Sequence, residues 1–558
     1  MKGSKAILVT KDIKHFDGDF DYIIVGAGSS GSAIAYRLAQ ENNMKVLLIE
    51  YGGHNSSIFI DMPAALSYPM NMKKYNWGFT TEPEPNLLGR SLICPRGKGL
   101  GGSSSINGMI YVRGHPQDFD NWSAQGASRW SFSHVLPYFK KLEACKNKSS
   151  PWRGENGPIR IKTAEQKNVL HTVFSEAAVQ SGYSLTEDYN GYKQEGIGAA
   201  DMTVHEGTRW STAKGYLKNI TKQKNICIMT SCLADRLLFS NNKCNGLVFR
   251  RKSEIFSAKS KNGVILAAGS IGNPCILQRS GIGNPKHIAG LGIKPFKNLE
   301  GVGNNLQDHL ELYFQVKCKQ PISLFKDNNL LSKARIFLEW YFFRKGLGTS
   351  NQFETLGFLR TDRNQKYPNL QYHFLPLAIN YDGSSPHKGH GFQFHVGTMR
   401  SKSRGTVAIK NADPTSQPSI KFNYLSHRDD LKDLRNAIKI TRNILNQTAF
   451  KDYAGDEIQP RSSLKTNTEL DQFIKSNVES AFHPCGTCKM GHPDDKETVV
   501  TPDCKINGLD NLFCADSSIF PSITNGNLNA PSIMVGEKAV DHILNKPLLP
   551  KENLIPYN

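Results

Sequence analysis

The feature that most constrains the fold is the stretch of residues 21–50, where a glycine-rich turn joins two short apolar runs. The first run, residues 22–25, is rich in β-branched side chains, which is typical of a strand buried on both faces. It leads directly into the turn Gly26-Ala27-Gly28-Ser29-Ser30-Gly31, after which apolar residues recur at helical spacing. The second run, residues 46–49, ends in Glu50. This order predicts a strand, a tight turn, a helix and a second strand.

A turn of this kind is suited to the pyrophosphate of a dinucleotide. Gly26 permits the tight turn, Gly28 lets the backbone approach the pyrophosphate, and Gly31 lets helix and strand pack closely. Ser29 and Ser30 begin the helix, whose N-terminus favours negative charge. Glu50 can accept hydrogen bonds from the ribose hydroxyls and would repel a 2′-phosphate, so we expect NAD or FAD rather than NADP. A purely structural turn is the weaker interpretation, because strand, helix and acid all occur at the expected spacing.

Length, composition and charge limit the class of protein. A chain of 558 residues with 39% hydrophobic and 21% charged residues is typical of a globular protein of about two domains. The formal net charge of +20 is compatible with nucleic acid, an anionic membrane surface or a solvated basic surface. Lysine and arginine are scattered and no nucleic-acid motif occurs, so we expect no nucleic-acid partner. Peripheral membrane association and a solvated basic surface both stay open.

No segment is predicted to cross a membrane or to direct export. The longest apolar run, residues 336–343, contains Glu339 and is followed by Arg344 and Lys345, far short of the roughly 20 apolar residues that span a bilayer. The N-terminal residues carry lysines together with aspartates, unlike a secretory signal or a transit peptide. Eleven cysteines without framework spacing indicate reduced thiols. These features favour a cytoplasmic location. The alternative is peripheral attachment to the inner face of the cell membrane.

A second glycine cluster occupies residues 96–108. So many small residues in succession predict a backbone that lies flat against a large ligand. A flexible linker is the alternative, but linkers lack the apolar run that follows at residues 109–112. From this cluster we expect the cofactor to contact Arg96, Gly101, Gly102, Ser103, Asn107 and Gly108.

The rest of the chain contains two kinds of pattern. Residues 264–270 repeat the order seen at residues 22–31, with an apolar strand, small residues and then a helix. Residues 226–229, 237–239 and 246–249 suggest strands of a meander near the cofactor. Residues 371–375 and 392–396 alternate with period two, which predicts a sheet with one face covered and the other lining a cavity. Helical patterns occur within residues 165–185 and over 429–446.

Four separated stretches together resemble one enzyme family. They are the turn at 26–31, RGKGLGGSSSINGMIYVRG at 96–114, VILAAGSIGNPCILQRSGIG at 264–283, and HPCGTCKMG at 483–491 with GNLNAP at 526–531. The chain resembles the glucose-methanol-choline (GMC) family of FAD-dependent alcohol oxidoreductases from about residue 20 to about residue 544. Motifs at 76–77, 81–85, 301–309, 351–354, 371–376, 378–381 and 481–491 are similar to those of its choline-oxidising members.

The resemblance implies a fold and a domain arrangement. We expect an α/β protein with α+β elements, in which a Rossmann-type FAD-binding domain carries a discontinuous antiparallel-sheet substrate domain. The FAD-binding domain is predicted at residues 20–160, 195–312 and 476–545, and the substrate domain at 161–194 and 313–475. Residues 1–19 and 546–558 are predicted to be terminal extensions.

The resemblance also implies a reaction and its residues. FAD would oxidise choline to betaine aldehyde, and further to glycine betaine, by hydride transfer to flavin N5, with an electron acceptor such as a quinone. His483 matches the family's active-site base and Asn529 the second member of its His-Asn pair. Because histidine titrates near neutrality, we expect His483 to take the hydroxyl proton without a large pKa shift. Asn529 would stabilise the developing alkoxide. Further cofactor contacts are expected at Ala234, Ala268, Gly269, Asp516, Asn529 and Pro531.

The substrate cation needs a carboxylate and aromatic faces, because a quaternary ammonium donates no conventional hydrogen bond. Glu354 and His373 align with substrate-pocket residues of choline-oxidising relatives, and Trp77 and Phe482 are candidate walls or ordinary packing residues. Two alternatives stay open. One is an enzyme, a dehydrogenase of another primary alcohol, and the other is a noncatalytic flavoprotein.

Three features qualify the resemblance. Tyr51 follows Glu50 where many relatives have alanine, which leaves the acid in place. Ile106 stands where some oxidases attach FAD through histidine, so we expect noncovalent FAD. Cys485 and Cys488 form C-x-x-C beside His483, but a structural zinc site needs four ligands, and we expect small packed residues and no metal.

Overall fold

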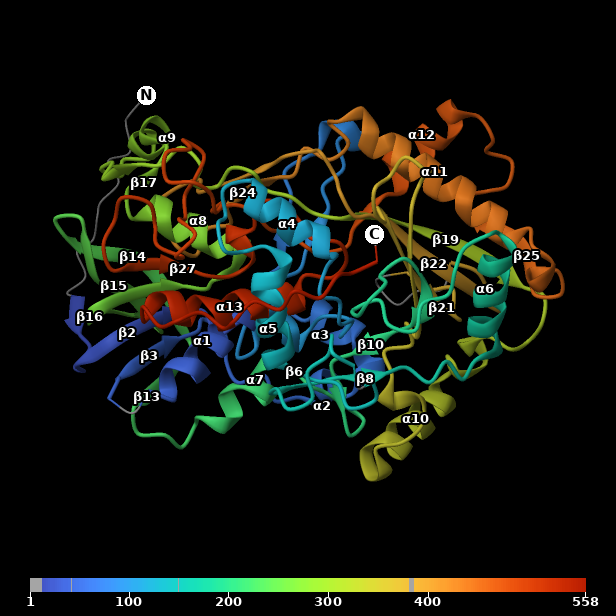
Figure 1. Ribbon diagram of the computed structural model, residues 1–558, viewed down its shortest axis with the longest axis horizontal. Helices are drawn as coiled ribbons and strands as arrows, with labels where there is room; N and C mark the ends of the chain where they lie inside the picture. Colours follow the sequence, from blue (N-terminus) through green and yellow to red (C-terminus); the bar gives the residue numbers. More distant parts are fainter. Residues whose placement is uncertain (1–12, 42, 149, 381–385, 558) are drawn as a thin grey trace.

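The computed structural model describes residues 13–41, 43–148, 150–380 and 386–557. Residues 1–12 of the predicted N-terminal extension and Tyr381 of the 378–381 motif lie outside the described residues. Two sheets lie side by side along the long axis of the molecule (Figure 1). The fold is mixed α/β with antiparallel sheets, as predicted.

The first sheet forms around the glycine-rich turn. Strand β2 (Phe20–Val25) leads into helix α1 (Ser29–Ala39) and then into β3 (Val46–Ile49), which confirms the predicted order. The strand order is β13-β3-β2-β16-β15-β14, with β27 (Leu512–Cys514) also pairing with β16 (Glu254–Leu266). Strands β13, β3, β2, β16 and β27 run parallel to one another. Their carboxyl ends therefore meet at one edge, where the turn lies.

The predicted meander needs one correction. Strand β13 (Ile226–Met229) pairs parallel with β3 at the edge of the nucleotide sheet, and only β14 (Cys232–Ser240), β15 (Lys243–Arg251) and β16 form the antiparallel meander. The apolar run of β13 extends the parallel part of the sheet. The alternation of apolar residues predicts a strand, but it does not show whether the strand pairs in parallel or belongs to a meander. Helices α1 and α13 (Asn529–Ile543) pack together, and α13 also packs on α5 (Phe132–Leu142).

The second sheet is antiparallel and is built from distant parts of the chain. Its order is β25-β19-β22-β21-β20-β9, with β26 pairing with β19. The strands are β9 (Gly196–Ala199), β19 (Leu310–Cys318), β20 (Thr355–Leu359), β21 (Leu370–Leu375), β22 (Gly391–Thr398), β25 (Ala454–Gln459) and β26 (Glu479–Ser480). Helices α6 (Val169–Gln180) and α11 (Arg428–Leu445) pack on it, and α12 (Asn467–Asn477) packs on α11.

The two faces of this sheet differ as the alternating pattern predicts. On β21, Tyr372 and Phe374 enter the hydrophobic core under α6 and α11. Their neighbours His373 and Leu375 line a cavity on the other face. The predicted boundary between the two domains lies at residue 312. In the structure this position falls inside one continuous strand, because β19 runs from residue 310 to residue 318. Strand β9, within the predicted FAD-binding range 195–312, hydrogen-bonds to β20 of the second sheet. The domain ranges themselves stay predictions.

The remaining elements connect or cover the two sheets. The helices are α2 (Ile58–Asp61), α3 (Ser67–Asn71), α4 (Pro116–Ala124), α7 (Thr212–Gly215), α8 (Gly269–Arg279), α9 (Pro285–Gly290) and α10 (Leu330–Phe343). The short strands are β1 (Ile13–His15), β4 (Phe79–Thr80), β5 (Ile93–Cys94), β6 (Glu143–Ala144), β7 (Ile159–Arg160), β8 (Lys162–Thr163), β10 (Asp201–Met202), β11 (Val204–His205), β12 (Thr208–Arg209), β17 (Ile282–Gly283), β18 (Lys297–Asn298), β23 (Thr406–Ala408) and β24 (Ser419–Lys421). Within the described part of the chain, none of the helices has the length and hydropathy to cross a membrane.

Candidate active site

A cavity of about 640 Å³ lies between the two sheets. At one end its wall is the glycine-rich turn, the tip of β3 and the glycine cluster. At the other end the wall consists of side chains from β19, β21 and β22, namely Glu311, Tyr313, His373, Leu375, Gln393 and His395. His483 and Asn527 also line it. One continuous space therefore connects the dinucleotide motif with the cavity-facing side of the second sheet.

Most residues predicted for the site line this cavity. They are Gly26, Gly28, Ser29, Ser30, Glu50, Trp77, Arg96, Gly102, Ser103, Asn107, Gly108, Ala234, Ala268, Gly269, His373, Phe482, His483, Asp516 and Asn529. Four do not: Gly31, Gly101, Pro531 and Glu354. A Cβ on Gly31 would meet Gly26 O at 1.9 Å, so this glycine allows α1 to pack against the strand end. Pro531 is buried in the first turn of α13, and Gly101 donates its N–H to Ala27 O at 2.8 Å.

The glycines of the wall fit a large flat ligand. A Cβ added to Gly28, Gly108 or Gly269 would meet no atom within 4 Å and would project into open space. All three line the cavity. A side chain at any of these positions would occupy room that a dinucleotide needs, which is the property expected of residues that contact a cofactor closely.

Glu50 is held rigidly at the tip of β3. Its carboxylate accepts hydrogen bonds from the backbone N–H groups of Ala27 (3.0 Å), Gly52 (2.8 Å) and Gly99 (3.0 Å). Burial raises the pKa of this carboxyl, and the three N–H donors oppose that rise. These contacts tie the first and second glycine clusters to one acid, so that both clusters keep a fixed geometry around the cavity.

His483 lies in a chain of side-chain contacts that fixes its tautomer. His309 Nε2 lies 3.1 Å from Met399 O, and because a carbonyl only accepts, this nitrogen carries a proton. Neutral His309 then accepts at Nδ1, which lies 3.0 Å from His483 Nδ1. His483 therefore donates from Nδ1 and presents a lone pair at Nε2. Asn527 Nδ2 lies 3.1 Å from that lone pair.

The structure corrects the predicted partner of His483. The amide that contacts its Nε2 belongs to Asn527, whereas Asn529 accepts a hydrogen bond from Ser29 Oγ at 2.8 Å. The reason is local: Asn529 is the first residue of α13 and its side chain meets the start of α1. Asn527 lies before the helix, and Gln371 Nε2 donates to its Oδ1 at 3.1 Å, which turns the amide N–H toward His483.

The electrostatics of His483 also differ from the prediction. Burial, together with His309, His373 and Arg96, lowers its pKa well below the ordinary value. Burial likewise lowers the pKa of His309 to about 3 and that of His373 to about 4. All three imidazoles are therefore neutral at neutral pH, which agrees with the hydrogen-bond chain. The expectation that His483 works without a large pKa shift is wrong.

The carboxylate of Glu311 lines the cavity, whereas Glu354 is not among the lining residues. The Glu354 side chain accepts from Ser350 Oγ at 2.6 Å and lies 3.9 Å from buried His171, away from the cavity lining. Glu311, on β19, lines the cavity, and one carboxylate oxygen lies 3.2 Å from His395 Nδ1. Glu354 directly precedes β20, and its backbone carbonyl accepts a hydrogen bond from Ala200 N–H.

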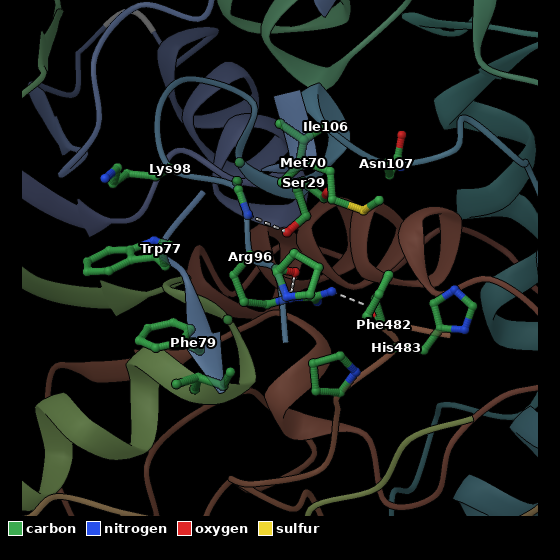
Figure 2. A pocket seen from close by; sticks show the side chains of 18 of the residues that line it. Ser29, Met70, Trp77, Phe79, Arg96, Lys98, Ile106, Asn107, Phe482 and His483 are labelled. Atoms are coloured by element: carbon green, nitrogen blue, oxygen red, sulfur yellow. Dashed lines mark hydrogen bonds between the residues drawn. The ribbon is translucent and has the colours of Figure 1, made fainter. Parts of the chain in front are cut away.

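Aromatic rings surround the Glu311 end of the cavity. Tyr313 stacks on His395 with ring centroids 4.1 Å apart, and Phe353 lies 5.2 Å from the same imidazole. The predicted wall residue Trp77 lines the other end, because it packs on Tyr51 (4.7 Å), the neighbour of Glu50. Figure 2 shows Trp77 and Phe79 on one side of Arg96, and Phe482 and His483 on the other. The backbone of Phe482 adopts a left-handed conformation (φ 64°), and its carbonyl accepts a hydrogen bond from the Arg96 guanidinium.

Cys485 and Cys488 are both free and buried in the hydrophobic core beside the site. Cysteine 485 N–H and carbonyl pair with Gln307, so the segment is held by backbone contacts. Among the described residues, no group of histidine, cysteine and acidic side chains has the arrangement of a metal site.

Sequence reasoning missed Glu311, His309 and Asn527. The alternation of Glu311 and Tyr313 in the run Leu310–Cys318 carried a usable signal, because residues two apart on a strand share a face. His309 and Asn527 carried no local signal of their own, since their roles depend on contacts between segments 174 and 44 residues apart.

Comparison with known proteins gives a consistent picture. Family models described as GMC oxidoreductase match residues 20–311 and 401–536. The chain is 50% identical over 537 residues to the oxygen-dependent choline dehydrogenase of Brucella anthropi, covering 96% of this chain and 98% of that protein. It is 47% identical to the protein of the same name from Rhizobium rhizogenes, with the same coverage.

Solved structures agree at the level of fold. Pyridoxine 4-oxidase from Mesorbium loti superposes with a TM-score of 0.86 at 27% identity, covering 95% of this chain and 100% of that one. A formate oxidase gives a TM-score of 0.88 at 26% identity, covering 96% and 99%. The likeness spans both sheets and the cavity between them.

Proposed function

The chain belongs to the GMC oxidoreductase family, and from this premise we propose that it oxidises choline to betaine aldehyde and, through the hydrated aldehyde, on to glycine betaine. It is an FAD-dependent oxidoreductase that acts on alcohol CH–OH groups. The observation that carries the choline assignment is the buried carboxylate of Glu311, which lines the same cavity as His483 and the glycine-rich turn.

His483 is the proposed base. Its Nε2 carries a lone pair because the Nδ1–H of His483 donates a hydrogen bond to His309, and His483 and Asn527, whose amide contacts that lone pair, both line the cavity. A depressed pKa keeps the imidazole neutral, so it accepts a proton without first losing one. The same depression makes it a weak base, which suits proton transfer that occurs together with departure of the hydride.

Asn527 and His309 are proposed to act beside the base. The Asn527 amide lies 3.1 Å from His483 Nε2, so a substrate hydroxyl that replaced this contact would donate to the imidazole and accept from the amide. The amide N–H would then stabilise negative charge that develops on that oxygen. The His309 ring contacts His483 and the Met399 carbonyl, so we propose that it is a positioning residue that maintains the tautomer of His483.

Glu311 is proposed to hold the quaternary ammonium. At an effective dielectric constant of about 20, opposite charges 4 Å apart attract by about 4 kcal/mol before desolvation. Aromatic faces such as Tyr313 and Phe353 each add about 0.5–2 kcal/mol. The long-range field of a chain with net charge +20 opposes the cation, but salt screens that field beyond about 8–10 Å. The adjacent carboxylate therefore dominates.

FAD bound along the cavity would supply the hydride acceptor at flavin N5. The residues that would hold it are the turn at Gly26, Gly28 and Ser29, the acid Glu50, and the second glycine cluster. We propose that FAD binds noncovalently, because the side chain of Ile106, which lines the cavity, has no nucleophilic atom to which the flavin could be attached. Asn529 belongs to this cofactor wall through its contact with Ser29.

We propose a quinone as the electron acceptor and the cytoplasm as the location. The eleven cysteines are free, which suits a reducing compartment. The curated relatives are named oxygen-dependent, so oxygen is the competing acceptor. Anaerobic reduction of the enzyme by choline, followed by reoxidation with a quinone analogue or with air, compares the two directly; faster reoxidation by air would overturn the quinone assignment.

Substrate profiling tests the choline assignment. The enzyme is assayed with choline and with 3,3-dimethylbutan-1-ol, in which carbon replaces the charged nitrogen. We expect a kcat/KM for choline at least about tenfold higher, equivalent to about 1.4 kcal/mol of charge recognition. An equal preference for the neutral alcohol would contradict the proposal and favour another primary alcohol as substrate.

A further inference from the structure

Helix α10 presents apolar side chains to solvent. Leu331 is 84% exposed and Phe343 is 69% exposed, and four more large apolar residues of this short helix are exposed, namely Leu330, Leu338, Tyr341 and Phe342. Figure 1 shows α10 at the lower edge of the molecule, projecting away from both sheets. Contiguous apolar residues of this size on a soluble protein mark a surface that binds another phase or partner.

The helix is preformed and firmly attached. Asn329 caps its N-terminus by accepting from Ser332 N–H at 2.9 Å. Trp340 is buried, and its indole donates to Gly207 O at 2.7 Å. Trp340 packs with Met62 and Ala65 in a small cluster that Ile336 and Phe337 complete. One face therefore anchors the helix, and the exposed apolar residues lie on the remainder of its surface.

Basic side chains accompany the apolar ones. Residues 326–345 contain five cations, all exposed, and only two carboxylates. The cations are Lys326, Lys333, Arg335, Arg344 and Lys345. Of these, Arg335 lies 3.1 Å from Asp327, and Arg344 covers the Trp340 ring at 4.0 Å. Apolar side chains flanked by lysine and arginine match the pattern of a helix that lies in the headgroup region of an anionic bilayer.

We propose that α10 and its basic flanks, residues 326–345, form a docking surface for an anionic lipid bilayer. A second copy of the chain fits this surface less well, because a twofold contact would bring the same cations of two strongly basic molecules together. Anionic headgroups complement those cations, while the leucine and phenylalanine side chains enter the acyl boundary by about 5–10 Å. The helix lies in the interface plane and does not cross the membrane.

The position of α10 gives this docking a consequence for the cavity. The helix packs on Met62 and Ala65, and Ala64 and the adjoining Leu66 line the cavity. Docking through α10 therefore brings this wall of the cavity close to the bilayer. An acceptor dissolved in the membrane would be concentrated beside it, a consequence that rests on the proposed function, whereas the docking itself does not.

Vesicle binding of the FAD-loaded enzyme tests the proposal. Phosphatidylcholine vesicles with and without phosphatidylserine are mixed with the enzyme and sedimented at low salt and at high salt. We expect binding that needs phosphatidylserine and decreases with salt. Absence of binding to either kind of vesicle would overturn the proposal, whatever the enzyme's activity toward choline.

Matched variants locate the surface. L338S/F342S and K333E/K345E are each expected to lower the partition coefficient by about tenfold or more. The controls V179S/L185S and K222E/K224E change exposed side chains elsewhere and are expected to bind like the wild type. Flavin content and turnover with a water-soluble acceptor verify that every variant is folded.

Two outcomes of this comparison contradict the proposal. One is unchanged vesicle binding by both α10 variants. The other is a wild type that ignores vesicles but forms dimers that L338S/F342S abolishes in analytical ultracentrifugation, which would assign the helix to an interface between copies.

Discussion

The nucleotide end and the substrate end of the cavity are built in opposite ways. The nucleotide end comes from contiguous sequence: β2, the glycine-rich turn, α1 and β3 follow one another within residues 20–49. The substrate end combines strands from residues 310–318, 370–375 and 391–398 with loops at 483 and 527. The first is specified by local patterns, and the second by which distant segments meet.

This difference explains where prediction succeeded. The strand–helix order follows from short-range geometry, and the structure confirms it; Gly26, Gly28 and Glu50 line the cavity. The choices between Asn527 and Asn529, and between Glu311 and Glu354, depend on which way a side chain faces. That direction is set by contacts with distant segments, such as those of Asn527 with His483 and of Asn529 with Ser29, which sequence spacing does not fix.

Replacing His483 gives the largest expected effect at the substrate end. His483→Ala removes the neutral imidazole that presents its Nε2 lone pair to the cavity, so we expect kcat to fall about 10³- to 10⁴-fold. Steady-state kinetics on enzyme of equal flavin content measures this. His205→Ala, at a partly exposed histidine outside the cavity lining, serves as the control. A decrease below about tenfold would remove His483 from the proton transfer.

Replacing each asparagine in turn distinguishes a role at the substrate end of the cavity from a role at the nucleotide end. Asn527→Ala removes the amide at His483 Nε2, and we expect kcat to fall about 10²-fold with unchanged FAD affinity. Asn529→Ala removes the acceptor of Ser29 Oγ and is expected to weaken FAD binding, with kcat of the flavin-loaded enzyme changed by less than about tenfold. Flavin titration and saturated turnover distinguish them. The reverse pattern would restore Asn529 as the partner of His483.

A second matched pair concerns the carboxylates. Glu311→Gln removes the charge that faces the cavity, so we expect KM for choline to rise about tenfold or more while KM for the neutral isostere changes little. Glu354→Gln, away from the cavity, is the control and is expected to leave both values near those of the wild type. If Glu354→Gln instead raised KM for choline selectively, the cation would bind at that carboxylate.

The smallest expected effect is on pH dependence. The base must be neutral, and a neutral imidazole predominates above its pKa. Because burial, together with His309, His373 and Arg96, lowers the pKa of His483 well below 6.5, protonation should reduce kcat/KM only well below pH 6.5. A pH profile of kcat/KM at constant ionic strength measures the acid limb. A limb centred at or above pH 6.5 would mean that the imidazole is not buried as described.

Particular residues show why the remainder escaped prediction. The run Leu310–Cys318 forms one strand, but a predicted domain boundary at residue 312 divided it and hid the alternation of Glu311 and Tyr313. Asn529 begins α13 and so faces Ser29, a contact between residues 500 apart in the chain. The depressed pKa of His483 arises from burial and from His309, His373 and Arg96, which only the folded chain brings together.

A structure of the FAD-loaded enzyme with glycine betaine bound tests the site most directly, because this ligand keeps the trimethylammonium group and has no hydride to lose. We expect a carboxylate oxygen of the ligand within about 3.2 Å of Asn527 Nδ2 and next to His483, with the ammonium facing Glu311. Finding the ammonium at Glu354, or the ligand oxygen remote from His483, would contradict the arrangement.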